Sequence, residues 1–477
     1  MPAWADFVSA AERPEPTVFR IRGGERSEGD VLERLRTQGF ETRSLEGMPG
    51  FHQVEKGPGP ISATPEHWLG MIYVQQASTG VAAPVLGPRP GERVLDMCSA
   101  PGGKTTHMSD LMDDSGCLVA SEISENRIRG LLGNVYRLGH TNVLVVAGDG
   151  RTFPEGARFD RVLVDAPCSG EGTLRRRGGQ APDQSESFRR YVTGAQRALL
   201  ERAVGLTRPG GTVLYVTCTF APEENEAIVS DALQRLPVEL EPLSLPVPHA
   251  PGLTAFGGQS YDPRLEGAAR IYPQHFDSGG LFLARLRKID DGSVLPSGAD
   301  HGRAGWCPVP TQVPGEEIEE DVDGRMRTGV AEIVERFGIT VDLTRTRWLF
   351  RGGRAWLHTL DEWPLSTWAP GDWRAISTGF RAIDFDSQGR ARPTNDFLRW
   401  LGAEVGDRVV DLSREDLERL LRREAVGTEM DDRGPIALRY SGDVIGRGAI
   451  TVDGLKSEIP KARAADLSRG LGGVDGA

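Results

Sequence analysis

Residues 91–288 alternate between patterns typical of β-strands and of α-helices, and this alternation constrains the fold more than any other feature of the chain. Strands that are separated by helices pair in parallel and are covered by helices on both faces. The apolar runs predicted as strands are RVLDM, CLVASEI, NVLVVAGD, DRVLVDAP and TVLYVTC. We therefore predict an α/β fold with a doubly wound parallel sheet, which binds its ligands at the carboxyl ends of the strands.

The chain of 477 residues is long enough for two or three domains. We expect a small α+β domain over residues 1–60 and the α/β domain over 61–288. Residues 289–322 are rich in Pro, Gly and acidic residues, and are predicted to be a solvated linker. Residues 323–477 return to the patterning of a folded domain with short strands and helices.

The composition excludes several classes of protein. The sequence has no run of 18 apolar residues, which is the length needed to span a membrane, and its first residues lack the pattern of a secretory signal. The chain has five cysteines without a C-x-x-C pair, which argues against a disulfide framework and against a structural metal site. We expect a cytoplasmic protein without a metal. The net charge of −12 speaks against a broadly basic, nucleic-acid-binding surface, but it leaves room for a local basic groove.

The segment RVLDMCSAPGGKTTHMSDLM (93–112) combines a strand, a glycine turn and a helix. Such a turn brings the backbone and a helix N-terminus close to a ligand. The next two strands end in Glu122 and Asp149, where carboxylates could accept hydrogen bonds from a ribose and from an adenine amino group. Each acid alone could equally be a helix N-cap. Together the three features indicate the class I methyltransferase variant of the doubly wound sheet, with S-adenosylmethionine as cofactor.

Two cysteines follow the last two strands of this region. Strand four ends with Asp165 and Cys168, and strand five ends with Cys218. Because these strands are expected to be neighbours, both thiols should reach the same edge, beside the cofactor. Carbon 5 of cytosine accepts a methyl group only after a thiolate adds to carbon 6, so paired thiols beside a methyl donor point to this chemistry. The alternative, two small cysteines that fill a core, fits poorly with the polar, Pro- and Gly-containing loops.

Three motifs in this order, DMCSAPGGKT, DAPCSGEGTLRR and TCTFAPEENE, resemble the Sun (Fmu) family of RNA cytosine-5 methyltransferases. The resemblance covers about residues 65–288. It implies that Cys218 is the nucleophile and that Cys168 assists release of the product, while Lys104 contacts the base or the cofactor. Asp165 would hold the base at its amino and ring-nitrogen edge. The cofactor and base pocket would be lined by Cys98, Ser99, Ala100, Pro101, Gly102, Gly103, Lys104, Glu122, Arg127, Asp149 and Asp165.

The sequence departs from the family pattern at Ser99, where Ala is common, and at Glu122, where Asp is frequent. Because Glu reaches further than Asp, we expect ribose binding to persist. DNA cytosine methyltransferases also carry a Pro-Cys motif, but they lack the second thiol, so Cys218 favours RNA over DNA as the substrate.

Candidate RNA contacts lie outside these motifs. Arg345, Arg347 and Arg351 alternate with aromatic residues, among them Trp348, and the pattern fits either RNA stacking or a hairpin whose aromatics face the core. Residues 438–464, which include Lys456 and Lys461, resemble a PUA-like RNA-binding domain. Arg175 is a further candidate, and the N-terminal unit resembles the family's small RNA-recognition-like domain.

We thus expect an enzyme, a monomer, that methylates cytosine in rRNA or tRNA with the target base turned out of its helix. The alternative is an RNA-binding ribosome assembly factor whose methyl transfer is dispensable. A methyltransferase for a substrate other than nucleic acid is disfavoured by the paired thiols and by the terminal domains.

Overall fold

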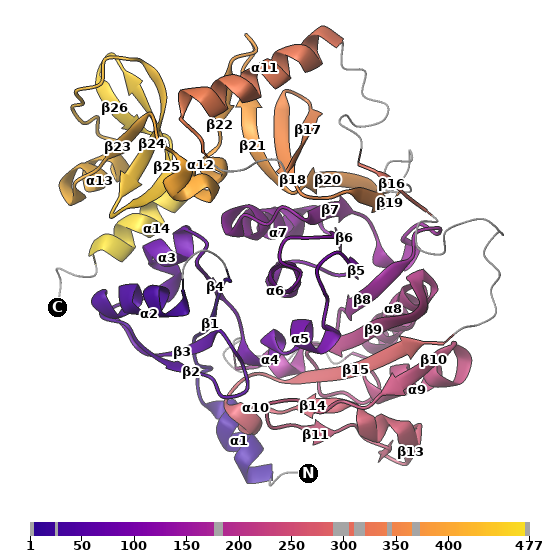
Figure 1. Cartoon of the computed structure of the whole chain (residues 1–477). Helices are drawn as coiled ribbons and strands as arrows, with labels where there is room; N and C mark the ends of the chain where they lie inside the picture. Colours follow the sequence, from indigo (N-terminus) through magenta and orange to yellow (C-terminus); the bar gives the residue numbers. More distant parts are fainter. Residues whose placement is uncertain are drawn as a thin grey trace.

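A computed structural model describes residues 4–23, 27–175, 185–289, 305–309, 320–340, 346–364 and 373–472 (Figure 1). Its largest element is a mixed sheet in which neighbouring strands run parallel in the order β9-β8-β5-β6-β7. These strands are β5 (Arg93–Asp96), β6 (Cys117–Glu122), β7 (Val143–Ala147), β8 (Phe159–Asp165) and β9 (Thr207–Thr217). They coincide with the predicted apolar runs, so the predicted α/β fold is confirmed.

Consecutive residues of the parallel strands point to opposite faces of the sheet, and each face has its own core. Leu95 packs toward α8 (Glu186–Leu206) and α9 (Glu226–Arg235), whereas Val94 packs toward the helices on the opposite face. Those helices are α5 (Ala82–Leu86), α6 (Gly103–Leu111) and α7 (Glu125–Leu138). Burial on both faces explains why the strands are continuous apolar runs rather than alternating ones.

Antiparallel strands extend the sheet at both edges. Beside β9 lies β15 (Leu281–Lys288), which also pairs with β10 (Val238–Glu241) and with β14 (Ala269–Ile271). The outermost strand there is β11 (Ala250–Pro251). At the other edge β20 (Arg374–Thr378) pairs with β7, so a strand from the C-terminal third of the chain completes the large sheet.

The N-terminal unit forms a small sheet in the order β2-β3-β1-β4. Its helix α2 (Glu28–Thr37) begins at Ser27, which makes a capping box with Asp30. The strands are β1 (Val18–Ile21), β2 (Glu41–Ser44), β3 (Phe51–Lys56) and β4 (Ile72–Val74). The N-terminal unit contains both helix and strands, as predicted, and β4 joins its sheet from beyond the predicted boundary at residue 60. A helix that was not predicted, α1 (Trp4–Glu12), precedes β1.

Two four-stranded sheets lie in the described part of the C-terminal region. The first has the order β17-β18-β21-β22 and is followed in the chain by the second, with the order β23-β24-β25-β26. The strands of the first are β17 (Arg347–Arg351), β18 (Arg354–His358), β21 (Phe380–Phe385) and β22 (Ala391–Pro393). Those of the second are β23 (Val409–Asp411), β24 (Gly434–Tyr440), β25 (Asp443–Thr451) and β26 (Gly454–Ser457). Four helices accompany them: α11 (Glu320–Arg336), α12 (Asn395–Leu401), α13 (Arg414–Leu421) and α14 (Lys461–Gly472).

The prediction of a solvated linker over residues 289–322 is wrong for residues 305–309. There β16 (Trp306–Pro308) pairs with β19 (Glu362–Pro364). The Trp306 ring is buried, lies edge-to-face on Phe159 with ring centroids 5.3 Å apart, and donates from Nε1 to the Arg158 carbonyl oxygen. The large sheet thus buries Trp306, and burial of a side chain of this size is a large stabilising contribution. Residues 290–304 and 310–319 of the predicted linker lie outside the described residues.

The N-terminal and C-terminal units meet along a seam at the short helix α3 (Pro65–Trp68). Trp68 donates from Nε1 to the Ile445 carbonyl oxygen at 2.8 Å, and its ring lies 4.2 Å from the Arg399 guanidinium and 5.9 Å from that of Arg463. Cation–π contacts to buried tryptophan are among the stronger ones of their kind. Trp68 therefore connects two parts of the protein: the segment that leads into the large sheet, and the last sheet of the chain.

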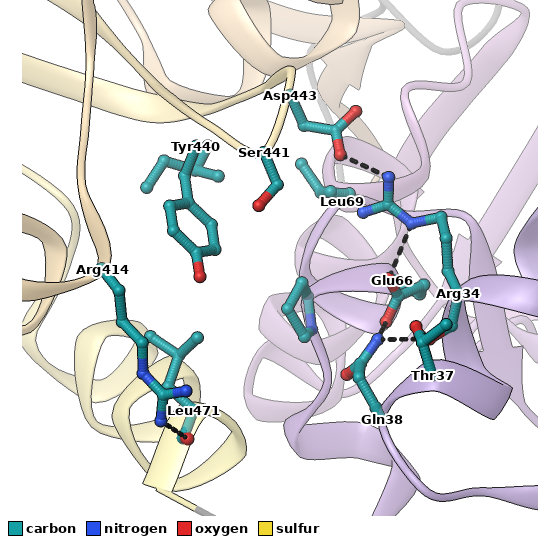
Figure 2. A pocket seen from close by; sticks show the side chains of 12 residues that line it. Arg34, Thr37, Gln38, Glu66, Leu69, Arg414, Tyr440, Ser441, Asp443 and Leu471 are labelled. Atoms are coloured by element: carbon teal, nitrogen blue, oxygen red, sulfur yellow. Dashed lines mark hydrogen bonds and ion pairs between the residues drawn. The ribbon is translucent and has the colours of Figure 1, made fainter. Parts of the chain in front are cut away.

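Figure 2 shows a cavity of about 270 Å³ in the same seam. Arg34 of α2 donates from Nε to Glu66 at 2.8 Å, and its Nη1 lies 2.7 Å from an Asp443 carboxylate oxygen of β25. Gln38 donates to the other oxygen of Glu66 at 2.9 Å. Glu66 is 1% exposed and Asp443 is 6% exposed, so their charges are compensated by a shared guanidinium inside the interface.

No helix within the described ranges has both the length and the apolar character needed to cross a membrane. Among the side chains that the structure describes, no cluster of His, Cys, Asp or Glu has the arrangement of a metal site.

Replacing Trp68 by Ala tests the seam. Loss of a buried tryptophan typically costs about 3–5 kcal/mol, so Trp68→Ala should lower the melting temperature by several degrees and expose the seam to limited proteolysis. The matched control is Trp4→Ala, because Trp4 is 69% exposed and its loss should leave the melting temperature within about a degree. Equal melting temperatures for Trp68→Ala and the wild type would show that Trp68 does not hold the seam.

Candidate active site

The strand order places the predicted site residues at one edge of the sheet. The chain runs from β5 outward to β7 and then continues at β8 on the other side of β5, so the direction of winding changes between β5 and β8. Ligands of doubly wound sheets bind at the carboxyl ends of the strands at such a point. In the register of β8 and β9, Asp165 lies opposite Val216, so the loops that carry Cys168 and Cys218 begin side by side.

The two thiols are in contact. Cys168 Sγ lies 3.3 Å from Cys218 Sγ, both cysteines are free, and both side chains are partly buried. The predicted neighbourhood of strands four and five is therefore confirmed, and with it the meeting of the thiols. The alternative of two core-filling cysteines does not describe this pair, since each retains access to solvent at the end of its strand.

The contact separates the acidities of the two thiols. The Cys168 thiol donates toward Cys218 and thereby lowers the pKa of Cys218, with the positive charge of Lys104 acting in the same direction against burial and Asp165. The same hydrogen bond, followed by burial, raises the pKa of Cys168 well above that of an ordinary thiol. Cys218 is thus the more acidic member of the pair and the one that forms a thiolate, the nucleophilic form of cysteine, more readily.

Lys104 and Asp165 form a second contact beside the thiols. The Lys104 ammonium donates from Nζ to Asp165 Oδ2 at 2.7 Å, and the side chains are 13% and 29% exposed. Burial lowers the pKa of Lys104, but the ion pair and hydrogen bond with Asp165 outweigh it and leave the pKa raised. Lys104 therefore stays charged and offers a positive group to both Asp165 and Cys218.

In each of the two loops that carry the thiols, one glutamate accepts hydrogen bonds from the other loop. Glu171 follows Cys168 and accepts from the Thr219 hydroxyl and the Phe220 amide, both at 3.2 Å. Glu224 follows Cys218 and accepts from the Ser169 amide at 3.0 Å. Buried carboxylates that accept backbone N–H groups are strong, charge-assisted anchors. The two loops are therefore held to each other by reciprocal bonds rather than by either strand alone.

The backbones of the same loops also touch. The Gly172 amide donates to the Cys218 carbonyl oxygen at 2.8 Å. A Cβ atom at Gly172 would lie 2.9 Å from that oxygen and 2.7 Å from the Gly280 carbonyl oxygen, so no larger residue fits there. The Ser169 and Thr219 hydroxyls, 2.7 Å apart, complete the connection.

The glycine turn after β5 has the shape predicted for a cofactor loop. Gly102 has a φ of 105°, and a Cβ atom there would lie 3.0 Å from Leu131. Helix α6 begins directly after Gly102. Gly102 is therefore the N-cap of this helix, and it makes no side-chain hydrogen bond to it. The Ser99 amide donates to the Ser121 carbonyl oxygen at 3.0 Å, and Arg127 donates to the Ala100 carbonyl oxygen at 2.5 Å. The remaining turn residues, Cys98, Pro101 and Gly103, lie in the same stretch, and burial raises the pKa of Cys98 well above that of a reactive thiol.

The two acids predicted for the cofactor have different surroundings. Glu122 is 2% exposed; one of its oxygens accepts from the Ser124 amide at 2.9 Å and the other lies 3.1 Å from Arg127. Asp149 caps a short 3₁₀ turn through the Arg151 amide, and both of its oxygens accept from the Arg151 guanidinium. Those hydrogen bonds lower the pKa of Asp149. The N-cap alternative is therefore what the structure shows for Asp149, whereas its contact with a cofactor stays a prediction.

Sequence reasoning missed three acids of the site. Glu171 and Glu224 lie inside the quoted motifs. The only sequence feature that could have indicated their role is that each is an acidic residue a few positions after an apolar strand. Asp96 ends β5, is 1% exposed and accepts from the Thr105 hydroxyl at 2.7 Å. Burial raises the pKa of Asp96 to about 7.

The prediction that Arg175 contacts RNA is wrong, because its guanidinium is used inside the protein. The side chain is 2% exposed and donates to the carbonyl oxygens of Arg13 and Pro14 and to Asp277. It thus holds the segment that follows α1. Residues 176–184 of the adjoining arginine-containing stretch lie outside the described residues.

The segment that follows Arg345 forms a hairpin, β17 and β18, with Gly352 and Gly353 at its turn. Phe350 and Trp356 are buried, and Trp348 lies edge-to-face on Phe397 with ring centroids 5.9 Å apart. The structure thus supports the hairpin with core-facing aromatics. Two of its arginines have partners in the protein: Arg347 pairs with Asp361 at 2.6 Å, and Arg351 donates to the Ala375 carbonyl oxygen at 3.0 Å. Arg345 itself lies outside the described residues.

The two lysines of the last sheet lie at the surface. Lys456 pairs with Asp453 at 2.5 Å, and Lys461 is exposed at the start of α14. Their contact with RNA stays a prediction, as does the PUA-like character of this region.

Comparison with known proteins also indicates a methyltransferase. Residues 83–287 match the family profile "16S rRNA methyltransferase RsmB/F". The chain is 29% identical to Ribosomal RNA small subunit methyltransferase F of Klebsiella pneumoniae over 97% of its own length and 93% of that protein. It is 32% identical to a mouse 28S rRNA (cytosine-C(5))-methyltransferase, with 63% of this chain and 38% of that protein aligned. The crystal structure of a methyltransferase homologue from Pyrococcus horikoshii superposes with a TM-score of 0.54 and 34% identity, over 60% of this chain and 90% of that one.

The acidity of Cys218 can be tested by alkylation. Only the thiolate reacts with iodoacetamide, so the rate at Cys218 should persist below the pH range of an ordinary thiol and fall as the pH drops through the lowered pKa. Cys168→Ala removes the donor, raises the pKa of Cys218 and should slow its alkylation at neutral pH severalfold. The rate is measured by mass spectrometry of the Cys218 peptide between pH 5 and pH 10, and Cys117→Ala, a change at a buried and distant thiol, is the control. An unchanged pH profile in Cys168→Ala would contradict the assigned hydrogen bond.

Proposed function

Because the chain belongs to the RsmB/F family of rRNA methyltransferases, we propose that it transfers a methyl group from S-adenosylmethionine to carbon 5 of a cytosine in small-subunit ribosomal RNA. The observation that carries this proposal is the contact between Cys168 and Cys218 at the edge of the sheet where the cofactor turn lies. The chain is an RNA cytosine-5 methyltransferase. The small subunit is favoured because the likeness to the small-subunit enzyme covers 97% of the chain, whereas the likeness to the 28S rRNA enzyme covers 63%.

The residues of the glycine turn fit S-adenosylmethionine. The N-terminus of α6, which begins directly after Gly102, attracts a carboxylate such as that of the cofactor's amino-acid part. Glu122, at the end of β6, is placed for ribose hydroxyls, and Asp149 follows the next strand. When bound, the cofactor supplies an electrophilic methyl group.

Cys218 supplies the electrons for the reaction. Its thiolate adds to carbon 6 of cytosine, and the ring electrons that are displaced make carbon 5 a nucleophile that accepts the methyl group. Solvent water then takes the proton from carbon 5, the carbon–hydrogen electron pair restores the double bond between carbons 5 and 6, and the carbon–sulfur bond breaks with its electron pair returning to Cys218. The protonated Cys168, 3.3 Å away, stabilises that leaving thiolate by a hydrogen bond. The separated pKa values of the thiols thus match the two roles.

Asp165 and Lys104 act on the base. Asp165 accepts a hydrogen bond from the exocyclic amino group of cytosine and so orients the base, while the positive charge of Lys104 beside it stabilises the negative charge that develops on the ring as the thiolate adds. Lys104 holds Asp165 in place through the 2.7 Å ion pair and keeps a positive charge beside Cys218.

The remaining features of the proposal concern the surroundings of the enzyme. Free, unpaired cysteines, one of them a thiolate, suit the reducing cytoplasm, where ribosomal RNA is also found. We expect the protein to act as a monomer, with RNA as its partner.

Methyl transfer is tested with small-subunit particles and with naked rRNA from a strain that lacks this gene. Wild-type protein with radiolabelled S-adenosylmethionine should label the rRNA, and bisulfite sequencing should locate one or a few protected cytosines. Cys218→Ala should lower the rate by at least about 10³-fold, because a nucleophile is lost, while its affinity for the cofactor stays within about twofold. Bound rRNA without methyl transfer by the wild type would instead support an assembly factor.

The roles of the two thiols are separated by trapping. Cys168→Ala should accumulate a protein–RNA adduct that survives denaturing electrophoresis, because the leaving thiolate has lost its hydrogen-bond donor. Cys218→Ala and the double variant should form none. An adduct in Cys218→Ala, or normal turnover in Cys168→Ala, would overturn the assignment.

A further inference from the structure

A row of aromatic rings leads from the surface to the loop of the nucleophile. Trp4 stacks on Phe7 of α1 with ring centroids 5.5 Å apart and an angle of 19° between the planes. Phe7 meets Phe220 edge-to-face at 5.5 Å, and Phe220 stacks on Tyr272 at 5.5 Å. Phe220 is two residues from Cys218, so α1 packs against the catalytic loop itself.

The inner end of this row is fixed by the site. The Phe220 amide donates to Glu171, and its carbonyl oxygen accepts from Arg270 at 3.0 Å. The Phe220 ring also lies so close to Gly280 that a Cβ atom there would come within 2.2 Å of it. Any movement of the ring would therefore disturb the loops that carry the thiols.

The outer end is held to the same loops. Arg175, at the end of the Cys168 loop, donates to the carbonyl oxygens of Arg13 and Pro14, and the Gly279 amide donates to Glu15 at 3.0 Å. Helix α1 is thus secured at both its aromatic face and its C-terminal end. Its place beside the active site is set by the protein before any RNA binds.

Trp4 nevertheless remains 69% exposed. A single exposed apolar residue needs no explanation. Here, however, the indole is ordered by its stack on Phe7 and belongs to a ring row that reaches the nucleophile's loop. An exposed, preorganised aromatic plane is the surface on which an unstacked base binds.

We infer that Trp4 is a stacking platform for the base of a nucleotide that flanks the target cytosine, an inference that rests on the proposed function. Turning the target base out of its helix removes the stacking partner of its neighbours, and an aromatic side chain beside the site can replace it. Arg13, 60% exposed and only loosely paired with Asp277 at 3.6 Å, lies on the same segment and can contact the phosphate of that nucleotide. Trp4 is a positioning residue that binds RNA and takes no part in the bond changes.

The test compares steady-state methylation by the wild type, Trp4→Ala and Trp4→Phe. Trp4→Ala should raise the KM for small-subunit rRNA about 5- to 50-fold, with kcat and the KM for S-adenosylmethionine within about twofold. Trp4→Phe should restore most of the loss, because it keeps an aromatic plane. Phe256→Ala, which removes another exposed aromatic side chain (46% exposed) that is outside this ring row, should change nothing.

A second readout locates the base. The probe is a single-stranded rRNA fragment that carries 2-aminopurine, in turn, on either side of the methylated cytosine. Binding to the wild type or Trp4→Phe should quench the fluorescence at one of these positions, and Trp4→Ala should abolish that quenching. A Trp4→Ala protein with wild-type KM or wild-type quenching would overturn the platform. A wild type that binds RNA and quenches the probe but transfers no methyl group would retain the platform and overturn the proposed function.

Discussion

The reciprocal bonds between the two thiol loops are the constraint on which the site depends. Strand pairing brings Asp165 opposite Val216, but the strands end before the thiols. Beyond the strands, Glu171 holds Thr219 and Phe220, Glu224 holds Ser169, and the Gly172 amide holds the Cys218 carbonyl oxygen. Only with both loops held can one thiol donate to the other at 3.3 Å and keep it as a thiolate. The charge of Lys104 is then positioned against Asp165 on the other side of the nucleophile.

The C-terminal third of the chain is built into the catalytic domain. Strand β20 extends the catalytic sheet beside β7, and Trp306 of the predicted linker is buried against Phe159. At the opposite end, Trp68 and the Arg34–Glu66–Asp443 group join the N-terminal unit to the last sheet (Figures 1 and 2). The N-terminal and C-terminal units are consequently held at set distances from the thiols. This arrangement suits a large, shaped substrate better than a short flexible one.

Charge alone would not predict an RNA enzyme from this chain. The net charge is −12, and arginines that looked available in the sequence have partners within the protein, as Arg175 has Asp277 and Arg347 has Asp361. Attraction to phosphate is therefore weaker than in a basic RNA-binding protein, and it decreases further with salt. Stacking and shape must supply more of the binding, which is consistent with an aromatic row beside the nucleophile.

The sequence by itself determined the α/β class and its strands, because apolar runs buried on both faces are local features, and cysteines in Pro- and Gly-containing loops marked the candidate thiols. It did not determine the partners of those residues. The sequence predicts an RNA contact for Arg175 and a solvated linker around Trp306, because nothing near them in the chain shows what covers them. Glu171, Glu224 and helix α1 were missed for the same reason. Their contacts join residues far apart in the sequence, such as Arg175 with Arg13 or Trp68 with Ile445. Only the tertiary structure decided which thiol carries the charge, because that depends on a 3.3 Å contact between two loops whose separation is set by long-range packing.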